Sequence, residues 1–573
     1  MKKLLVYLKG YYKESVLGPL FKLLEASLEL IVPLVVAAII DTGIGNGDRS
    51  YVVKMSFVLV ALGLIGLVFS VTAQFFAAKA SVGFVTRLRS ALFRHIQGFS
   101  YKTLDQVGTS TMITRMTSDM NQVQTGLNLA LRLLLRSPFV VFGAMIMAFT
   151  VDSKAALWFA GVIPILCVVV FGIMLISMPL YKKVQGLLDK VLGRTRENLT
   201  GVRVIRAFGR EESETQDFCE KNEQLTAMQK HVGHISALMN PVTYVIINLA
   251  VLGLIWTGAL RVEAGIITQG AVVALYNYMS QILVELIKMA NLIISITKAV
   301  ACLNRIEAVM EIPTGEDELN EEHEKAAPEL RVEMRNAGIR YAMGGENALT
   351  GVDFKVKPGE TVGVIGGTGS GKTTLVNLIP RFYTATEGAV FIDGVDVRDL
   401  NSEQLRARIG VVPQKAVLFQ GTIRENLLWG NENATEEDLL AAVENAQAAD
   451  VLASKGGLDG VVEQGGRNLS GGQKQRLTIA RALVKKPDIL ILDDSSSALD
   501  FATDAALRKA LKTLRGEPTV FIVSQRTSSI QHADQIIVLD DGEVAGVGTH
   551  EKLLANCPVY QEIYASQFKK EAE

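Results

Sequence analysis

Residues 366–373 read Gly-Gly-Thr-Gly-Ser-Gly-Lys-Thr and directly follow the apolar run 361–365, TVGVI. This spelling fits the pattern G-x-x-x-x-G-K-[ST], in which a glycine-rich loop joins a buried strand to the start of a helix. The glycines allow backbone amides to wrap around phosphate oxygens at a helix N-terminus. We expect Lys372 to reach the outer phosphates of a nucleotide and the Thr373 hydroxyl to hold Mg²⁺. A chance glycine loop is disfavoured because a strand pattern precedes it and a helix pattern follows.

A second motif lies further along the chain, where residues 488–493, DILILD, predict a buried strand that ends in the carboxylate of Asp493. A carboxylate there can hold Mg²⁺ or its water shell opposite Thr373. Between the two motifs stands Leu469-Ser470-Gly471-Gly472-Gln473, followed by a helix pattern that begins KQRLTIARAL. LSGGQ in this position resembles the signature motif of the ABC family of ATPases.

The resemblance implies ATP and Mg²⁺ as cofactors and assigns roles to further residues. Tyr341 resembles the aromatic residue that stacks on adenine, Gln414 resembles the Q-loop glutamine, and Glu463 resembles the X-loop of exporters. The resemblance also makes Ser497, Ala498, Leu499 and Asp500 the D-loop. The implied ATP contacts are Tyr341, Gly366, Gly367, Thr368, Gly369, Ser370, Gly371, Lys372, Thr373, Thr374 and Gln414, with Mg²⁺ held by Thr373, Gln414 and Asp493.

The part of the chain before these motifs is apolar enough to lie in a membrane. The 573 residues are 49% hydrophobic and only 20% charged, which is unusual for a purely soluble protein of this size. A net charge of −1 argues against nucleic-acid binding, because phosphate backbones need a clustered positive excess. Stretches of about 20 apolar residues, the length that spans a bilayer, occur near residues 22–40, 52–78, 133–151, 155–177, 241–259 and 266–287.

The distribution of Lys and Arg predicts how these six spans are oriented. The connections after the second and fourth spans are long and basic, whereas the other three are short and poor in Lys and Arg. By the positive-inside rule, both long connections, both termini and everything after the sixth span are cytoplasmic. The long connections carry helical periodicity and are predicted to continue the membrane helices. We interpret residues 1–20 as an amphipathic helix on the inner membrane surface rather than as a signal peptide.

The resemblance extends to the membrane half of the chain. Residues 104–123, LDQVGTSTMITRMTSDMNQV, and 197–212, ENLTGVRVIRAFGREE, are similar to the two intracellular loops whose coupling helices press on the nucleotide domains of exporters. The predicted architecture is a membrane all-α six-helix domain of the type I exporter, or type IV ABC, fold at residues 1–310. An acidic linker at 311–328 joins it to an α/β P-loop ABC nucleotide-binding domain at 329–573. The resemblance implies that the six helices exchange elements with a partner half.

Two residues depart from the family pattern around the terminal phosphate. The family places glutamate after the aspartate of the buried strand to polarise the attacking water, whereas this chain has Asp494, whose carboxylate is one methylene shorter. Such a displacement of about 1 Å can cost on the order of a hundredfold in rate. In the switch loop the family has histidine, and this chain has Gln525, which can donate a hydrogen bond but cannot relay a proton. The two departures together predict a site kept for binding rather than turnover, although Asp494 acting through a shifted water is an alternative.

The signature motif is nevertheless intact, and in ABC proteins each ATP lies between one chain's glycine loop and the other chain's signature. We therefore expect a non-identical half-transporter with catalytic glutamate and histidine as partner, to whose site this chain contributes Ser470, Gly471 and Gly472. This pattern resembles bacterial heterodimeric multidrug exporters in the cytoplasmic membrane, whose substrates are small amphipathic compounds. Two alternatives stay open: an ATP-sensing regulatory or channel-like subunit, and a homodimeric lipid exporter.

Carboxylates inside predicted spans are candidates for a substrate pocket. Glu25 and Glu285 each have a lysine three residues away, Lys22 and Lys288, and are interpreted as interfacial ion pairs. Glu29 lies deeper in the first span, where we expect it to face an inward cavity and to favour cationic amphipathic substrates.

Overall fold

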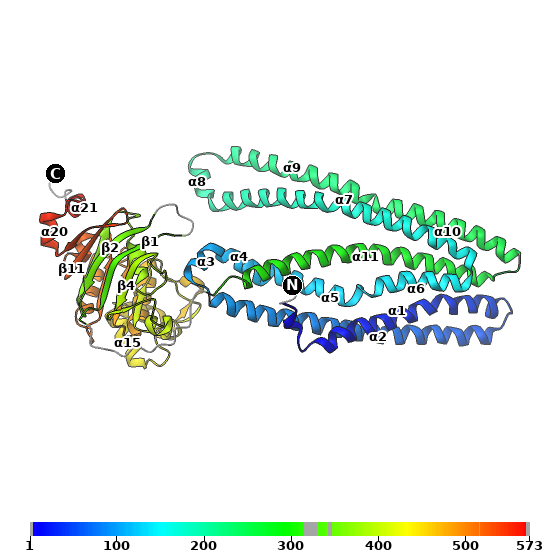
Figure 1. The fold of residues 1–573 in the computed structure, drawn as a ribbon, viewed down its shortest axis with the longest axis horizontal. Coiled ribbons are helices and arrows are strands. Elements are labelled where there is room, and N and C mark those ends of the chain that lie inside the picture. Colours follow the sequence, from blue (N-terminus) through cyan, green and yellow to red (C-terminus); the bar gives the residue numbers. More distant parts are fainter. Residues whose placement is uncertain (1–3, 315–328, 342–346, 515, 569–573) are drawn as a thin grey trace. The chain divides into compact units, whose positions relative to one another are not determined.

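The computed structural model of the chain describes residues 4–314, 329–341, 347–514 and 516–568 (Figure 1). It divides into two compact units, one formed by Met1–Gln97 with Ser110–Ile312 and the other by Gly98–Thr109 with Pro313–Glu573. Of the acidic linker expected at 311–328, residues 315–328 lie outside the described residues.

The first unit is an all-helical bundle with six helical segments long and apolar enough to cross a membrane, which confirms the predicted spans. Their bounds are Tyr12–Ile44, Arg49–Gln97, Thr109–Val151, Ser153–Thr200, Glu211–Glu263 and Gln269–Met310. The segments are 33–53 residues long, so they extend well beyond the roughly 20 residues that a bilayer requires. The helices are α1 (Tyr12–Ala38), α2 (Arg49–Gln97), α4 (Thr109–Thr114), α5 (Met120–Leu133), α6 (Arg136–Val151), α7 (Ser153–Thr200), α8 (Val202–Ala207), α9 (Glu211–Ala237), α10 (Met239–Glu263) and α11 (Gln269–Met310), with π-helical turns η2 (Ile39–Ile44) and η3 (Arg115–Asp119).

The expectation of one amphipathic helix over residues 1–20 was wrong. In the described part of this stretch, a short 3₁₀ helix, η1 (Leu4–Leu8), is followed by α1, which begins at Tyr12 and continues into the first span. Gly10 adopts a φ of +98°, a conformation that side-chain-bearing residues avoid, and it separates the two elements. Residues 12–20 of the stretch expected to form a surface helix therefore belong to the same helix as the first predicted span.

Small residues allow the spanning helices to approach closely, as is usual where lipid supplies no hydrophobic driving force between helices. Ala26, Ala73, Ala77 and Ala144 are fully buried. A Cβ on Gly143 of α6 would lie 2.5 Å from Leu30 Cδ1 of α1, so glycine allows this contact without a shift of the Leu30 side chain. In Figure 1, α9 and α10 follow the length of α7, while α1 and α2 form a second antiparallel pair.

The second unit is an α/β domain built on two main sheets. The central sheet has the order β12-β11-β3-β10-β9-β6, in which β11, β3, β10, β9 and β6 are parallel and β12 pairs antiparallel to β11. The smaller sheet is antiparallel with the order β2-β1-β4-β5, and β7 and β8 form a two-stranded ribbon. The strands are β1 (Val332–Ile339), β2 (Leu349–Val356), β3 (Thr361–Gly366), β4 (Glu387–Ile392), β5 (Val395–Asp396), β6 (Ile409–Val412), β7 (Gly421–Thr422), β8 (Val461–Val462), β9 (Ile489–Asp493), β10 (Thr519–Val523), β11 (Gln535–Asp540) and β12 (Glu543–Gly548).

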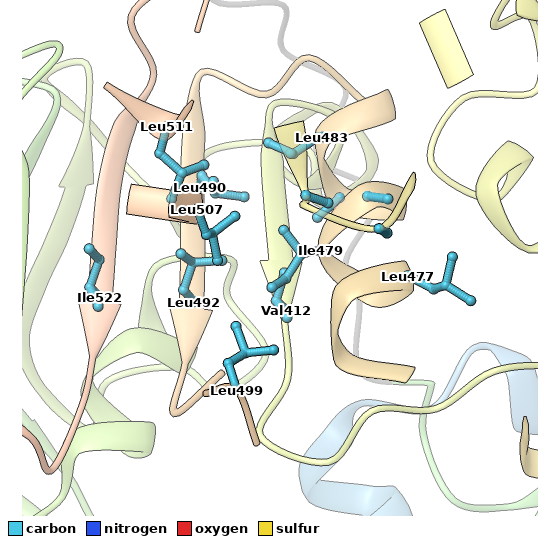
Figure 2. Packing of buried hydrophobic residues seen from close by; sticks show 14 of the residues in the cluster. Val412, Leu477, Ile479, Leu483, Leu490, Leu492, Leu499, Leu507, Leu511 and Ile522 are labelled. Atoms are coloured by element: carbon cyan, nitrogen blue, oxygen red, sulfur yellow. The ribbon is translucent and has the colours of Figure 1, made fainter. Parts of the chain in front are cut away.

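Helices cover the central sheet and form its hydrophobic core. Figure 2 shows Leu490 and Leu492 of β9 and Val412 of β6 beside Ile479 and Leu483 of a helix, and all five belong to one buried cluster. The helices of the unit are α3 (Tyr101–Val107), α12 (Lys372–Leu378), α13 (Ser402–Ala407), α14 (Ile423–Leu428), α15 (Glu436–Asn445), α16 (Ala449–Lys455), α17 (Gly471–Val484), α18 (Phe501–Leu511), α19 (Thr527–Ile530), α20 (His550–Asn556) and α21 (Pro558–Phe568), with one 3₁₀ turn, η4 (Gln464–Gly466). The parallel sheet places the carboxyl ends of β3, β9 and β10 at one edge.

Helix α3, part of the first predicted coupling loop, packs within this second unit. The ring of Tyr101 stacks on Phe382 with centroids 4.4 Å apart, and Tyr383 Oη donates a hydrogen bond to Asp105 Oδ2 at 2.6 Å. Burial and the neighbouring Asp105 raise the pKa of Tyr383, so its hydroxyl keeps its proton and remains a donor at physiological pH. The coupling segment is thus attached to the α/β domain by aromatic stacking and a charge-assisted hydrogen bond.

Candidate functional site

The glycine loop runs from the end of β3 to the first turn of α12. Gly369 and Gly371 have φ values of +87° and +92°, which favour glycine. A Cβ on Gly371 would also lie 2.8 Å from the Ala348 carbonyl oxygen, so glycine is required there on two grounds. A Cβ on Gly367 or on Gly369 would meet no described atom within 4 Å. The loop therefore presents open space beside its backbone amides, as a phosphate-binding loop must.

Lys372 lies inside this loop. Its Nζ donates hydrogen bonds to the carbonyl oxygens of Gly366 at 2.9 Å and Gly367 at 2.5 Å. Burial lowers the pKa of Lys372, an effect that the nearby carboxylates of Asp494 and Asp493 partly oppose. A partly desolvated ammonium group that is held by neutral carbonyls gains most from an anionic ligand, because its charge is not yet neutralised.

The predicted magnesium ligands are in direct contact. Thr373 Oγ1, in the first turn of α12, donates a hydrogen bond to Asp493 Oδ1, at the end of β9, across 3.1 Å. Asp493 is buried, and this burial raises the pKa of its carboxyl. A hydroxyl and a carboxylate oxygen this close form a donor set that suits Mg²⁺, which takes oxygen ligands. The cation would also offset the cost of ionising a buried acid.

A cleft of about 370 Å³ joins these groups to the other predicted nucleotide contacts. Tyr341 borders it and donates from Oη to Thr374 Oγ1 at 3.1 Å, so the expected adenine-stacking ring is held against the helix that follows the loop. The lining comprises Tyr341, Ala348, Thr368, Gly369, Gly371, Lys372, Thr373, Thr374, Gln414, Asp493, Asp494, Val523 and Gln525. Of the residues predicted to contact ATP, Gly366, Gly367 and Ser370 do not line this cleft, and Ser370 is buried behind the loop.

The two departures from the family pattern face this one cleft. Asp494 follows β9 with a φ of +45°, and its backbone amide donates to the carbonyl oxygen of Val523 at 3.0 Å. Its side chain accepts a hydrogen bond from Gln414 Nε2 at 3.3 Å. Gln525 follows the neighbouring strand β10 and is exposed. Because adjacent parallel strands end at the same edge, the two side chains reach the cleft that holds Lys372.

The signature motif is separate from this cleft. Ser470 caps α17, where its Oγ accepts from Gln473 N at 3.3 Å while Gln473 Oε1 accepts from Ser470 N at 2.9 Å. Ser470 and Gly471 are exposed, Leu469 is buried, and no residue of 469–473 is among those that line the cleft. The motif is therefore presented on the surface rather than to the chain's own glycine loop.

The D-loop lies next to the signature. A Cβ on Gly472 would lie 3.0 Å from the carbonyl oxygen of Ala498. Ser497 and Ala498 are exposed, and Leu499 is buried in the core. Asp500 caps α18 by accepting from Thr503 N at 2.9 Å, and its hydrogen bonds with Thr503 lower the pKa of Asp500.

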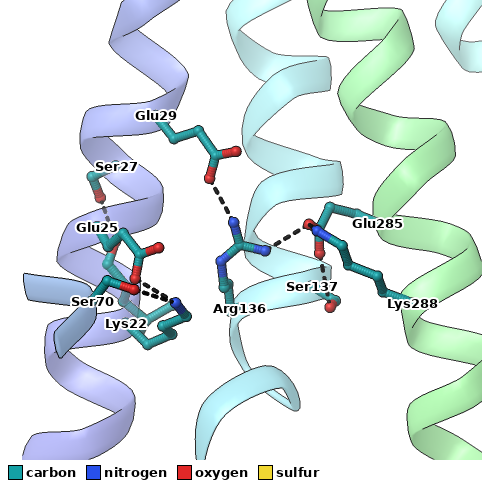
Figure 3. A network of polar contacts seen from close by, with 10 residues as sticks. Lys22, Glu25, Ser27, Glu29, Ser70, Arg136, Ser137, Glu285 and Lys288 are labelled. Atoms are coloured by element: carbon teal, nitrogen blue, oxygen red, sulfur yellow. Dashed lines mark hydrogen bonds and ion pairs between the residues drawn. The ribbon is translucent and has the colours of Figure 1, made fainter. Parts of the chain in front are cut away.

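In the membrane unit, Glu29 belongs to a network that the sequence analysis did not anticipate. The predicted pairs form, with Lys22 Nζ 2.5 Å from Glu25 Oε2 and Lys288 Nζ 2.8 Å from Glu285 Oε1. Figure 3 shows that Arg136, at the start of α6, reaches carboxylates of two other helices.

The two arginine bonds are short. Arg136 Nη2 lies 2.5 Å from Glu29 Oε2, and Arg136 Nη1 lies 2.6 Å from Glu285 Oε1. Ser137 Oγ donates to the second oxygen of Glu285 at 3.0 Å. Glu29 is therefore an ion-paired carboxylate whose side chain stays 41% exposed, rather than a free charge. The sequence did contain a signal for this network. Arg136 lies inside the predicted span 133–151, and charged residues inside membrane spans usually pair with one another.

Comparisons with known proteins agree with this geometry. Residues 15–286 match the family model described as ABC transporter transmembrane region, and residues 349–497 match the family model described as ABC transporter. The uncharacterized ABC transporter ATP-binding protein YfiB of Bacillus subtilis is 38% identical over 100% of this chain and 99% of its own length.

Two further relatives carry functional names. The putative multidrug export ATP-binding/permease protein YgaD of Bacillus subtilis is 32% identical, with 99% of each chain covered. The ATP-dependent lipid A-core flippase of Desulfotalea psychrophila is 32% identical over 84% of each chain. Among solved structures, a bacterial Atm1-family ABC exporter with ATP bound has a TM-score of 0.81 at 24% identity, covering 98% of this chain and 99% of that one. At that identity the structural match shows the fold alone.

Proposed function

The chain belongs to the ABC transporter family, and from this premise we propose that it is one half of a heterodimeric exporter whose own ATP site binds nucleotide but turns it over weakly. It is a multi-pass membrane protein in which an exporter-type helical domain is fused to a transport ATPase domain. The proposal adds a non-identical partner half, amphipathic substrates, and a cytoplasmic position for the ATPase domain and both termini.

The observation that carries the proposal is that Asp494 and Gln525 border the same cleft as Lys372. The backbone amides of the glycine loop and Lys372 bind the phosphates, while Thr373, Gln414 and Asp493 provide oxygens for Mg²⁺. When bound, Mg²⁺-ATP supplies the phosphoanhydride whose cleavage resets the transporter.

Among its described residues, the same cleft lacks a well-placed general base for activating a water molecule. The shorter side chain of Asp494 holds its carboxylate farther from that water than glutamate would. The amide of Gln525 orients the terminal phosphate by donating a hydrogen bond but carries no proton between groups. This site consequently suits prolonged ATP binding more than rapid turnover.

The exposed signature supports a dissimilar partner. Ser470 and Gly471 are presented away from the chain's own cleft, where a second chain's nucleotide can reach them. A signature kept intact beside a weak site is useful only if the partner's site performs the hydrolysis. The partner would supply glutamate and histidine at the two positions where this chain has Asp494 and Gln525.

For the substrate, we propose small hydrophobic or amphipathic compounds, with cations preferred at Glu29. Arg136 engages one oxygen of Glu29, and the side chain remains 41% exposed, so the carboxylate can still attract a cation. The similarity to a multidrug export protein supports this class of substrate. The similarity to a lipid A-core flippase favours a second candidate, a homodimeric lipid exporter.

The function is tested by transport into inside-out membrane vesicles. The chain is co-produced with its partner half, and ATP-dependent uptake of a fluorescent cationic dye is compared with flipping of a fluorescent phospholipid. We expect dye uptake that stops when the partner's catalytic glutamate is replaced by glutamine. Flux that continues without hydrolysis would indicate a gated channel instead, and phospholipid flipping by the chain alone would indicate the homodimeric lipid exporter.

A further inference from the structure

Gln567 lies one residue before the end of the last described helix, α21, about forty residues away in sequence from the switch loop that carries Gln525. Its side-chain amide nevertheless makes three hydrogen bonds to that loop. Nε2 donates to the carbonyl oxygen of Gln525 at 2.7 Å, and Oε1 accepts from both the backbone amide and the hydroxyl of Thr527 at 2.9 Å. One carboxamide thus bridges the two peptide groups on either side of Arg526.

The switch loop needs such a partner because its own sequence does not cap the short helix that follows. Helix α19 begins at Thr527, and the side chain of its N-cap residue, Arg526, makes no capping hydrogen bond. The first amide of a helix has no partner within the helix. Gln567 satisfies this amide from another element, while Arg526 extends over the ring of Phe501 with its guanidinium 5.1 Å from the ring centroid.

We infer that Gln567 is a positioning residue for the ATP site, and that it holds the switch loop so that Gln525 faces the terminal phosphate. The inference rests on the proposed role of Gln525 as a hydrogen-bond donor to that phosphate. Gln525 is exposed and borders the cleft, so its backbone must be held for its side chain to keep one direction. The C-terminal helix thereby becomes part of the nucleotide site without touching nucleotide.

This role predicts different effects of Gln567 on the affinities for ATP and for ADP. ADP lacks the terminal phosphate, so its binding does not depend on where Gln525 points. A residue that acts through Gln525 must therefore change the affinity for ATP and leave the affinity for ADP unaltered. A residue that only stabilises the domain changes both affinities or neither.

The test uses the full-length chain in lipid nanodiscs, with Mg²⁺-ATP and Mg²⁺-ADP affinities measured by displacement of a fluorescent nucleotide. Gln567→Ala should lower the preference for ATP over ADP about fivefold and leave ADP affinity unchanged. This is the effect of losing one hydrogen bond, the one that Gln525 donates to the terminal phosphate. Gln567→Glu keeps acceptors for Thr527 but cannot donate to Gln525, so it should show the same selective loss while preserving the helix cap.

Matched controls are available in the chain. Gln561 lies on the same helix and donates from Nε2 to the Leu554 carbonyl oxygen at 2.6 Å, so Gln561→Ala removes a similar bond away from the switch loop and should leave the preference intact. Gln525→Ala should itself lower the ATP preference, and adding Gln567→Ala to it should change nothing more, because the two residues act as one unit.

Four results would overturn the inference: equal losses of ATP and ADP affinity in Gln567→Ala, no change of either affinity in that variant, additive losses in the double variant, or a wild-type chain with no preference for ATP. Hydrolysis measured on the same nanodiscs separates this test from the proposed function. Brisk hydrolysis by the chain alone would contradict the weak-site proposal, while the affinity ratios would still decide the role of Gln567.

Discussion

Gln414 donates a hydrogen bond from its side-chain amide to Oδ2 of Asp494 across 3.3 Å. The Q-loop amide and the carboxylate that stands in place of glutamate therefore face each other within the cleft that holds Lys372. A side chain one methylene longer would extend this carboxylate further toward the water that attacks the terminal phosphate. The proposed weakness of the site rests on two side chains, Asp494 and Gln525, and both can be replaced.

The first prediction restores the missing groups. Asp494→Glu combined with Gln525→His should raise ATP hydrolysis by the purified chain on the order of a hundredfold, because a correctly placed base recovers what a 1 Å displacement costs. Each single substitution should recover less than the pair, since residues of one catalytic unit act together. Steady-state phosphate release measures the effect. A double variant no faster than the wild-type chain would show that another feature limits turnover.

The second prediction concerns Asp493, whose buried carboxyl has a pKa raised above the ordinary value of 3.8. Since the folded state binds this proton more tightly than the unfolded state, stability falls as pH rises from 3.8 through the raised pKa. Asp493→Asn cannot lose stability in this way, because its side chain does not ionise. At neutral pH and without nucleotide, its melting temperature should therefore be about 2 °C higher than that of the wild-type chain.

Bound Mg²⁺-ATP should reverse this order, so that the wild-type chain melts at a higher temperature than Asp493→Asn. A saturating ligand stabilises the fold by about 2.7 kcal/mol at a hundredfold excess over Kd. We expect Mg²⁺-ATP to stabilise the wild-type chain and to have little effect on Asp493→Asn, which cannot offer a carboxylate to the cation. Thermal unfolding with EDTA and with Mg²⁺-ATP provides the comparison. If the variant gained as much from Mg²⁺-ATP as the wild type, Asp493 would not be a magnesium ligand.

The positions of the nucleotide-binding groups could be predicted from sequence because their spacing is local or belongs to a known family pattern. Asp493 ends β9, and the loop that follows the end of β3 leads to Lys372 and Thr373 in the first turn of α12. The parallel sheet brings these two strand ends together. Asp494 and Gln525 were identified by the residues they replace, and both border the cleft. Such contacts follow from strand order.

Contacts between residues with no fixed spacing could not be predicted in this way. Arg136 and Glu285 are 149 residues apart and meet only because α6 packs against α11. Gln567 reaches the switch loop through the packing of α21 on α19, which no sequence pattern encodes. The error at the N-terminus has a local cause, because Gly10 was not recognised as the break between two elements. Tertiary packing and single backbone conformations were thus the missing information.

A third prediction tests the role of the signature motif. A Cβ on Gly471 meets no described atom within 4 Å, and the residue is exposed, so Gly471→Glu should leave the fold of this chain intact. In a complex with the proposed partner half, the added carboxylate should repel the ATP bound by that half and reduce hydrolysis at least tenfold, since like charges at close range are costly. Phosphate release by the purified complex is the measurement.

The small substitution Gly471→Ala serves as the control for this experiment and should reduce hydrolysis much less. Thermal unfolding of the isolated Gly471→Glu chain verifies that its own fold is unchanged. Full activity of the Gly471→Glu complex would mean that the signature of this chain does not serve the hydrolysing site.

A fourth prediction concerns substrate charge. Glu29→Gln should weaken transport of cationic amphipathic dyes about fivefold, the upper range for a partly exposed ion pair, and change transport of a neutral analogue little. Arg136 keeps Glu285 as a partner, so the bundle should remain folded. Glu25→Gln, one turn earlier and paired with Lys22, is the matched control and should affect both dyes equally. Equal effects of Glu29→Gln on both dyes would remove Glu29 from the substrate pocket.

The most direct measurement is the rate of ATP hydrolysis by the purified full-length chain, with no second protein present, in lipid nanodiscs. The central claim is that the side chains around the terminal phosphate cannot activate water well, so turnover depends on a different subunit. It predicts a rate close to background for the chain alone. Rapid hydrolysis that persists after Asp494→Asn would contradict the claim.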